Sequence, residues 1–323
     1  MGRSAESRIL AGFLDPGRTD ASALFIEGDA GIGKTTLWLD GLRLARERGF
    51  TVLAAQPAPA ESTLDHGVLT DLLDQAYPAS GEAWTSLRAS QRLALERIVH
   101  ADEPARGEDA RAVAAGFLAL IRALAVDAPV LIAIDDVQWS DPSSREALAF
   151  AARRVAGPVS LLVTERTTPQ AAPARTRLRL LQPEATRTLE VGPLSLGGLH
   201  AVLRERLRRS FPRPTMARIA EASGGNPFYA LELGRAMLGG GAGDAAADAV
   251  PLPGTLIELV AARLDALAPE SHPPLLAVAC LGAPTLSTVA RAAETDPGGR
   301  RPAAGAGRGP GHRGHRGEPG PVL

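Results

Sequence analysis

Gly28-Asp29-Ala30-Gly31-Ile32-Gly33-Lys34-Thr35 is the stretch that decides the fold, because it matches the pattern GxxxxGK[ST] in full. The glycines of this pattern let several backbone N–H groups turn towards one point. A short apolar strand over residues 23–27 comes before the loop, and a helical pattern over 34–48 follows it. The positive end of that helix dipole points at the same place. Strand, loop and helix together predict a P-loop that holds the phosphates of a nucleoside triphosphate.

Each residue of the loop has an expected role. Lys34 should reach the β- and γ-phosphates, and the Thr35 hydroxyl should ligate Mg²⁺. Thr36 should help to hold the phosphate end. Lys34 is also the single lysine of a chain with 35 Lys+Arg, and a compact ammonium fits here better than a planar guanidinium, although chance alone can place one lysine anywhere. The residues expected to bind the nucleotide here are Gly28, Asp29, Ala30, Gly31, Ile32, Gly33, Lys34, Thr35 and Thr36.

A second pattern is a fully apolar strand over 130–134 that ends in Asp135 and Asp136. Two neighbouring carboxylates repel each other unless a cation lies beside them. Such a Walker B pattern predicts that Asp135 holds Mg²⁺, directly or through water, and that Asp136 orients the attacking water. The alternative is a turn that is acidic by chance. Glutamate is commoner at the second position, so the pattern supports nucleotide binding more firmly than fast hydrolysis.

A third candidate is Arg166, which ends the stretch Thr164-Glu165-Arg166 after the next apolar strand. A cation at this place can sense the γ-phosphate, so we count Arg166 with Asp136 as a candidate catalytic residue. A plain surface arginine is the alternative. Arg153 and Arg154 lie on the preceding predicted helix and are candidates to act in trans, on the site of a neighbouring copy of the chain. The alternative is an ordinary solvated helix face, which has the same composition.

The chain divides by its periodicity. Strands alternate with helices over 1–193, which predicts an α/β fold with a doubly wound, mostly parallel sheet. Residues 194–240 have helical patterns only, and helical patterns continue over 250–295. Residues 296–323 are rich in Gly, Pro, Arg and His and lack apolar periodicity, so we expect a disordered tail. A tail that touches RNA is one alternative, and a frameshifted end is favoured, because GC-rich DNA read out of frame has this composition.

Composition excludes several classes of protein. The formal net charge is -1, so nothing indicates a nucleic-acid-coating or membrane-surface protein. One cysteine, Cys280, excludes a disulfide framework, and its apolar surroundings predict a buried thiol. No signal peptide follows Met1, and no apolar run reaches the roughly 20 residues that span a bilayer. We therefore expect a soluble, cytoplasmic protein without a membrane partner.

A fourth stretch, Gly225-Asn226-Pro227-Phe228, ends one helix and begins another, and locally it predicts only a turn. Together, however, the motifs resemble the nucleotide-binding module of STAND-type ATPases, in the group of AAA ATPases similar to origin-recognition proteins. The resemblance is most specific to the large LuxR-type ATP-dependent transcriptional regulators of actinobacteria. It covers residues 2–293 and rests on five segments: Gly2–Glu6 (GRxxE), Gly28–Thr36, Ile134–Asp141, Gly225–Phe228 and Pro253–Leu267.

The resemblance implies further residues and partners. It implies that Arg3 lies near the adenine and that Pro227 approaches the nucleotide from a helical lid over 194–240. It implies that 250–295 begin a winged-helix-like region. It also implies a switch between ATP and ADP with Mg²⁺ as cofactor, self-association on ATP binding, and ATP rather than GTP as ligand. The relatives' sensor repeats and DNA-binding helix-turn-helix have no counterpart here, so we do not expect this chain itself to bind DNA.

Three functional hypotheses remain open from the sequence. The first is a slow ATPase that acts as the switch module of a signal-responsive transcriptional regulator. The second is a DNA-associated initiator-type AAA ATPase, which predicts a basic stripe or a helix-turn-helix in 250–323. Only Arg208-Arg209 and the tail offer clustered cations. The third is a non-functional truncated product, whose last helices would lack packing partners.

Overall fold

The structure is a computed structural model, which describes residues 2–76, 81–100, 110–167, 178–239, 264–265, 267–280 and 286–293. By its internal contacts the chain divides into two units, Met1–Ala266 and Leu267–Leu323. We describe each unit by itself. The expected boundaries at 193, 240 and 295 are not tested by this division and stay predictions. The expected disordered tail and part of the expected winged-helix-like region, including residues 250–263, lie outside the described residues.

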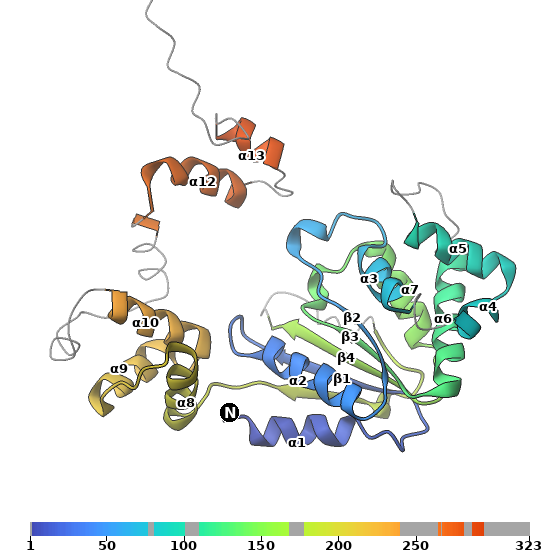
Figure 1. Cartoon of the computed structure of the whole chain (residues 1–323), viewed down its shortest axis with the longest axis horizontal. Helices are drawn as coiled ribbons and strands as arrows, with labels where there is room; N and C mark the ends of the chain where they lie inside the picture. The colour runs from blue at the N-terminus through green and yellow to red at the C-terminus, as the bar shows by residue number, and fades with distance from the viewer. Residues whose placement is uncertain are drawn as a thin grey trace, which may run out of the picture. The chain divides into compact units, whose positions relative to one another are not determined.

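A five-stranded parallel sheet forms the centre of the first unit (Figure 1). Its strands lie in the order β2-β3-β4-β1-β5. The α/β fold with a doubly wound sheet is therefore confirmed. β4 extends through Arg166, three residues beyond the apolar run that predicted it. The strands are β1 (Ser22–Gly28), β2 (Thr51–Ala55), β3 (Val130–Ile134), β4 (Val159–Arg166) and β5 (Thr186–Glu190).

Helices cover both faces of the sheet. Of the helices between β2 and β3, α4 is short and α6 is the longest. Among the described residues of unit one, no helix combines the length and the apolar character required to cross a bilayer, and the same holds for unit two. The helices of the first unit are α1 (Ser4–Phe13), α2 (Lys34–Glu47), α3 (Gly67–Ala76), α4 (Gly81–Thr85), α5 (Ala89–Val99), α6 (Ala110–Asp127), α7 (Pro142–Ala152), α8 (Leu196–Leu207), α9 (Arg213–Ser223) and α10 (Pro227–Gly239).

Alternate side chains of the strands enter two separate cores. Leu24 and Ile26 of β1 pack with α1 and α2 on one face of the sheet, and Ala23 and Phe25 pack with α3, α5, α6 and α7 on the other. Strands buried on both faces are apolar at every position, which is why β3 reads as one uninterrupted apolar run. The two cores hold the sheet rigid beneath its carboxyl-terminal edge.

A third core joins α8, α9 and α10, which follow β5. Its buried members are Leu194, Leu199, Leu203, Met216, Ile219, Ala230, Leu233 and Met237. The all-helical character expected after Pro193 is therefore observed through Gly239. In the second unit the structure describes α12 (His272–Cys280), which follows a short 3-10 turn at Pro269–Ser271, and α13 (Leu286–Ala292). The side chain of Cys280 lies outside the described residues.

Asp141 fixes the loop that leaves β3. It is the N-cap of α7, and its Oδ1 accepts a hydrogen bond from Ser144 N at 2.7 Å. The same carboxylate also accepts from His66 N at 3.0 Å and from Val68 N at 3.2 Å, at the start of α3. Asp141 is 1% exposed. One buried carboxylate thus caps two helices on the same face of the sheet, a connection that sequence spacing does not reveal.

We expect Asp141→Ala to lower the free energy of unfolding by about 3 kcal/mol, because three backbone N–H groups lose a charged acceptor and two helices lose a cap. Equilibrium unfolding in urea measures the change. Asp65→Ala is the matched control, since Asp65 is exposed and accepts only from the Ser143 hydroxyl among the hydrogen bonds found. It should cost less than about 0.5 kcal/mol. Equal effects of the two substitutions would show that the double cap is not important.

Candidate functional site

The candidate residues gather at one edge of the sheet because parallel strands end together. Gly28, the last residue of β1, lies in register with Arg166 of β4. On the other side of β4, Ile134 lies in register with Val163. Asp135 therefore comes beside Thr164, and Gln56 follows β2 at the same edge. This is the edge where open α/β sheets bind ligands.

The P-loop begins at the end of β1 and leads into α2. Gly31 and Gly33 have positive φ angles of 75° and 106°, which favour glycine, and Gly33 is the N-cap of α2. The buried Lys34 side chain folds back over the loop, where its Nζ donates to Gly28 O at 2.9 Å and to Asp29 O at 2.8 Å. The loop therefore curls around its own ammonium.

Burial lowers the pKa of Lys34, and the nearby charge of Arg166 acts in the same direction. The carboxylates of Asp136, Asp135 and Asp29 oppose this shift without cancelling it. Lys34 is thus electrostatically coupled to the acid pair and to Arg166, although they lie on three different strands or loops. The hydroxyls of Thr35 and Thr36 belong to exposed residues in the first turn of α2.

Asp135 is buried and held by neutral donors. Its Oδ1 accepts from the Thr164 hydroxyl at 2.5 Å, and its Oδ2 accepts from Gln56 Nε2 at 3.2 Å. Its backbone N–H donates to Ala55 O at 3.0 Å. Among the residues that the structure describes, Asp135 forms no ion pair with arginine or lysine. A buried carboxylate that lacks a bonded cation favours a cation beside it.

Asp136 has a different environment, because it forms an ion pair. Arg166 Nη2 lies 2.9 Å from its Oδ2, and Arg166 Nε donates to its Oδ1 at 3.3 Å. Gln138 Nε2 donates to the same Oδ1 at 3.0 Å. Burial alone raises the pKa of Asp136, but the hydrogen bonds from Arg166 and Gln138 and the charges of Arg166 and Lys34 outweigh it, so the pKa lies below its usual value. The two acids are thus chemically distinct.

The other candidate arginines have local partners. Arg154 lies over the ring of Phe150 at 3.8 Å from its centroid, and it donates to Phe150 O. Arg3 donates to Ile32 O in the P-loop at 2.8 Å, to Gly192 O after β5 at 2.7 Å and to Glu6 at 3.0 Å. Arg3 therefore ties the P-loop to the segment that leads into α8. The expected contact of Arg3 with adenine stays a prediction.

The turn before α10 contacts the P-loop through Asn226. Asn226 Nδ2 donates to Ala30 O at 2.9 Å, and its Oδ1 accepts from Phe228 N at 3.0 Å. A Cβ built on Gly31 would lie 2.7 Å from the Cβ of Phe228, so the approach requires glycine. Pro227 is half-buried at the start of α10. Its expected role towards a nucleotide stays a prediction.

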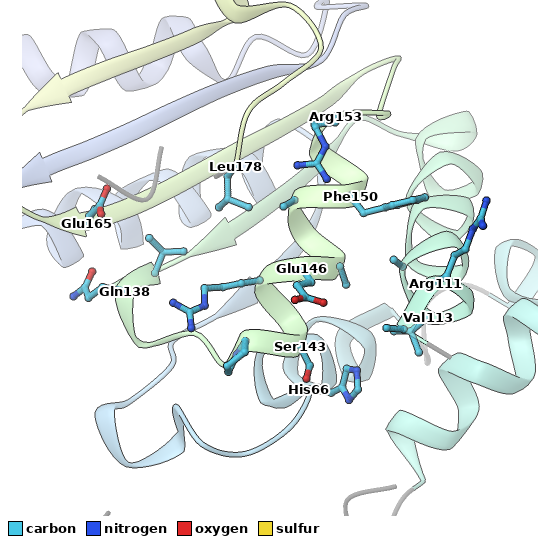
Figure 2. Close-up of a pocket in the computed structure, with 17 residues that line it drawn as sticks. His66, Arg111, Val113, Gln138, Ser143, Glu146, Phe150, Arg153, Glu165 and Leu178 are labelled. Carbon is cyan, nitrogen blue, oxygen red and sulfur yellow. The ribbon is translucent and has the colours of Figure 1, made fainter. Parts of the chain in front are cut away.

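A cavity of 770 Å³ lies on the opposite face of the sheet from α2, between α6 and α7 (Figure 2). Arg111 and Val113 enter it from α6, and Glu146 and Phe150 enter it from α7. Gln138, which donates to Asp136, forms part of its wall at the sheet edge. No P-loop residue is among the residues that line this cavity, and Gln138 is the contact between the cavity and the acid pair.

Sequence reasoning missed several residues of the cluster. Thr164 and Gln56 hold Asp135, and Gln138 holds Asp136. The one available signal in the sequence concerns Thr164, which is a polar residue directly after an apolar strand pattern. In the structure Thr164 is fully buried. Asn226 lay inside a recognised motif, but only Pro227 was selected from it. These four residues act through side-chain amides or hydroxyls, which periodicity does not distinguish from surface positions.

A family model described as an AAA ATPase domain matches residues 1–164, just over half of the chain. The chain belongs to the AAA ATPase domain family. This AAA ATPase domain contains the P-loop, the acid pair and β4 as far as Thr164.

Individual similarities are more distant. An uncharacterized protein of Rhizobium meliloti (strain 1021) is 33% identical over an alignment of 195 residues, and the match covers 51% of this chain and 19% of that protein. The chain thus spans about a fifth of the length of this curated relative. A STAND protein with a tetratricopeptide repeat sensor from Pyrococcus horikoshii is similar at a TM-score of 0.46 and 15% identity, over 86% of this chain and 34% of that one. A Thermotoga maritima RuvB variant has a TM-score of 0.41 and 13% identity, over 92% of this chain and 82% of that one.

We expect the Asp136–Arg166 pair to make stability depend on pH. In the AAA ATPase domain the pKa of Asp136 is lowered, so the pair stabilises the fold above the unfolded-state pKa of about 3.9 and loses this contribution as the pH falls through the folded-state value. Arg166→Met should lower the free energy of unfolding at pH 7 by at most about 1 kcal/mol, because the pair is partly exposed. The difference from wild type should begin to shrink as the pH falls below about 4 and should vanish once the pH lies below the folded-state pKa of Asp136.

Urea unfolding at pH 7 and pH 3 measures this difference. Arg153→Met is the control, because it removes an exposed arginine that makes no ion pair with another described residue. Its effect should not change in this pH range. A pH-independent effect of Arg166→Met would contradict the pairing.

Proposed function

We propose that this chain is the ATP-binding switch module of a signal-responsive regulator and that it hydrolyses ATP slowly with Mg²⁺. One observation carries the proposal: the P-loop with Lys34, the acid pair and Arg166 lie together at the carboxyl-terminal edge of the neighbouring strands β1, β3 and β4. A buried ammonium beside a ring of backbone N–H groups suits a polyanion. Asp136, which is paired with Arg166, and Asp135, which has no arginine partner, suit two different tasks in phosphoryl transfer: orienting water and holding the metal ion.

The P-loop lysine has a simple exchange available. Its two bonds to Gly28 O and Asp29 O are bonds from a cation to neutral carbonyls. Phosphate oxygens carry negative charge and form stronger, charge-assisted hydrogen bonds with an ammonium. Lys34 therefore gains by turning to the β- and γ-phosphates. The surrounding burial that lowers the pKa of Lys34 also strengthens its attraction to phosphate.

Asp135 and Thr35 are the residues that would hold Mg²⁺. Mg²⁺ prefers hard oxygen ligands and usually keeps several waters, with one or two carboxylates and the substrate phosphates completing its shell. Asp135 fits this pattern because its carboxylate is buried, ionisable and bonded only to neutral donors. When bound, Mg²⁺ neutralises charge on the β- and γ-phosphate oxygens. In the described residues, no cluster of three His, Cys, Asp or Glu offers a competing metal site.

Arg166 and Asp136 provide the switch. While they are paired, the Asp136 carboxylate accepts hydrogen bonds from Arg166 and Gln138, so it is poorly available to orient water. A γ-phosphate attracts Arg166 away, since it presents more negative charge than one carboxylate. Asp136 then becomes available for the attacking water. The need for this exchange accounts for slow hydrolysis.

The helical lid is the proposed output of the switch. Asn226 and Phe228 contact the P-loop at Ala30 and Gly31, so movement of the loop reaches α10 directly. We propose that Pro227 and Arg3 complete the nucleotide site from this side. We also propose a sheet domain over 1–193, a lid over 194–240 and a winged-helix-like segment over 250–295. Transcriptional control, of the LuxR type that the motifs resemble, and self-association on ATP binding belong to the same proposal.

We expect Lys34→Ala to weaken Mg²⁺-ATP binding at least about 100-fold, because a buried charge-assisted contact to phosphate is lost. Titration calorimetry or a fluorescent ATP analogue measures the dissociation constant. Arg46→Ala is the control, since Arg46 is an exposed cation at the other end of α2. It should change the affinity less than about twofold. Equal affinities of wild type and Lys34→Ala would exclude the P-loop as the binding site.

We expect Asp136→Asn to separate binding from hydrolysis. The amide keeps the shape of the side chain but cannot accept a proton, so kcat for ATP hydrolysis should fall about 100-fold or more. The dissociation constant for ATP should change less than about threefold, because the proposed metal ligand is Asp135. Phosphate release under single-turnover conditions measures the rate. Unchanged hydrolysis would remove Asp136 from the mechanism.

A further inference from the structure

We propose that Thr164 is a positioning residue that orients Asp135 for Mg²⁺ and at the same time holds the backbone of Asp136. The inference rests on the proposed function and extends it to a residue outside the P-loop and the acid pair. Thr164 is fully buried in β4, between β3 and β1. Its hydroxyl contacts both acids: it donates to Asp135 Oδ1 at 2.5 Å and accepts from Asp136 N at 2.7 Å.

The direction of these hydrogen bonds is determined by their partners. A backbone N–H can only donate, so Asp136 N supplies its hydrogen to Thr164 Oγ1. An ionised carboxylate can only accept, so the Thr164 proton must point to Asp135 Oδ1. The hydroxyl is therefore locked in one rotamer and acts as a fixed donor. With Gln56 on the other oxygen, it leaves one orientation for the Asp135 carboxylate.

The second bond stabilises an unusual backbone. Asp136 has φ 47° and ψ 52°, in the left-handed region that non-glycine residues rarely adopt. This conformation turns the chain sharply after β3 and directs Asp136 towards Arg166. The bond from Asp136 N to Thr164 holds the turn. Loss of the hydroxyl would therefore release both acids together.

β4 contributes Thr164 and Arg166 from alternate positions, which point to the same side of a strand. Thr164 contacts Asp135, and Arg166 contacts Asp136. One strand thus orients the proposed metal ligand and restrains the proposed catalytic acid. Ser160, at the other end of β4, has a buried hydroxyl that contacts only Ser22 among the hydrogen bonds found, at 3.3 Å. It is a matched position without any acid.

The test compares Thr164→Val, Thr164→Ser and Ser160→Ala with wild type in the full chain. The readouts are ATP affinity in EDTA, ATP affinity as Mg²⁺ is titrated, and the thermal unfolding midpoint in EDTA. Valine keeps the shape of threonine without its hydroxyl, and serine keeps the hydroxyl. If Thr164→Val does not fold, Thr164→Cys replaces it, because a thiol is a weak donor of similar size.

We expect Thr164→Val to raise the Mg²⁺ concentration for half-maximal effect about tenfold or more, as for other residues that orient metal ligands. Its ATP affinity in EDTA should stay within about twofold of wild type, because the loop itself is intact. Thr164→Ser should restore the Mg²⁺ response. Ser160→Ala should lower the unfolding midpoint but leave the Mg²⁺ response as in wild type. If wild type responds to Mg²⁺ and Thr164→Val responds equally, the positioning role of Thr164 is overturned and the proposed function is not. Absence of ATP binding by wild type overturns the proposed function and the assignment with it.

Discussion

The carboxylates of Asp135 and Asp136 create the constraint on which the site depends. Two adjacent negative charges at the end of a buried strand repel each other, and burial makes each of them costly. The structure resolves this conflict unequally. Asp136 receives a full positive charge from Arg166, whereas Asp135 receives only dipoles from Thr164 and Gln56. The remaining imbalance of charge lies next to Lys34 and the P-loop, where the proposed function places a metal ion with a polyanion.

This arrangement requires the strand order of the sheet. β4 lies between β1 and β3, so its end is adjacent to both the P-loop and the acid pair. Without that intervening strand, neither Thr164 nor Arg166 would reach an aspartate. The loop after β3 must also be rigid, and Asp141 makes it so by capping α7 and α3 with one buried carboxylate. The positions of the two acids are thus fixed from both ends of a short turn, by β4 on one side and by two helices on the other.

The sequence predicted what is local and missed what depends on strand order. The P-loop and β3 were correctly located because each is specified by a few neighbouring residues. The partner of Asp136 was not predictable, because Arg166 is distant in sequence and reaches it only across the sheet. The same holds for Thr164, which periodicity marks only as the end of an apolar run.

The paired state of Asp136 bears on what kind of ATPase this family member is. An enzyme adapted to rapid turnover keeps its catalytic acid available, whereas here the acid is engaged by an arginine whose own pKa is raised by the same bond. Under the proposed mechanism, each turnover would therefore break the Asp136–Arg166 ion pair before Asp136 could orient water. A protein that spends most of its time with nucleotide bound and unhydrolysed is suited to report a state rather than to perform work. The direct contact of Asn226 and Phe228 with the P-loop gives that state a route to the helices that follow the sheet.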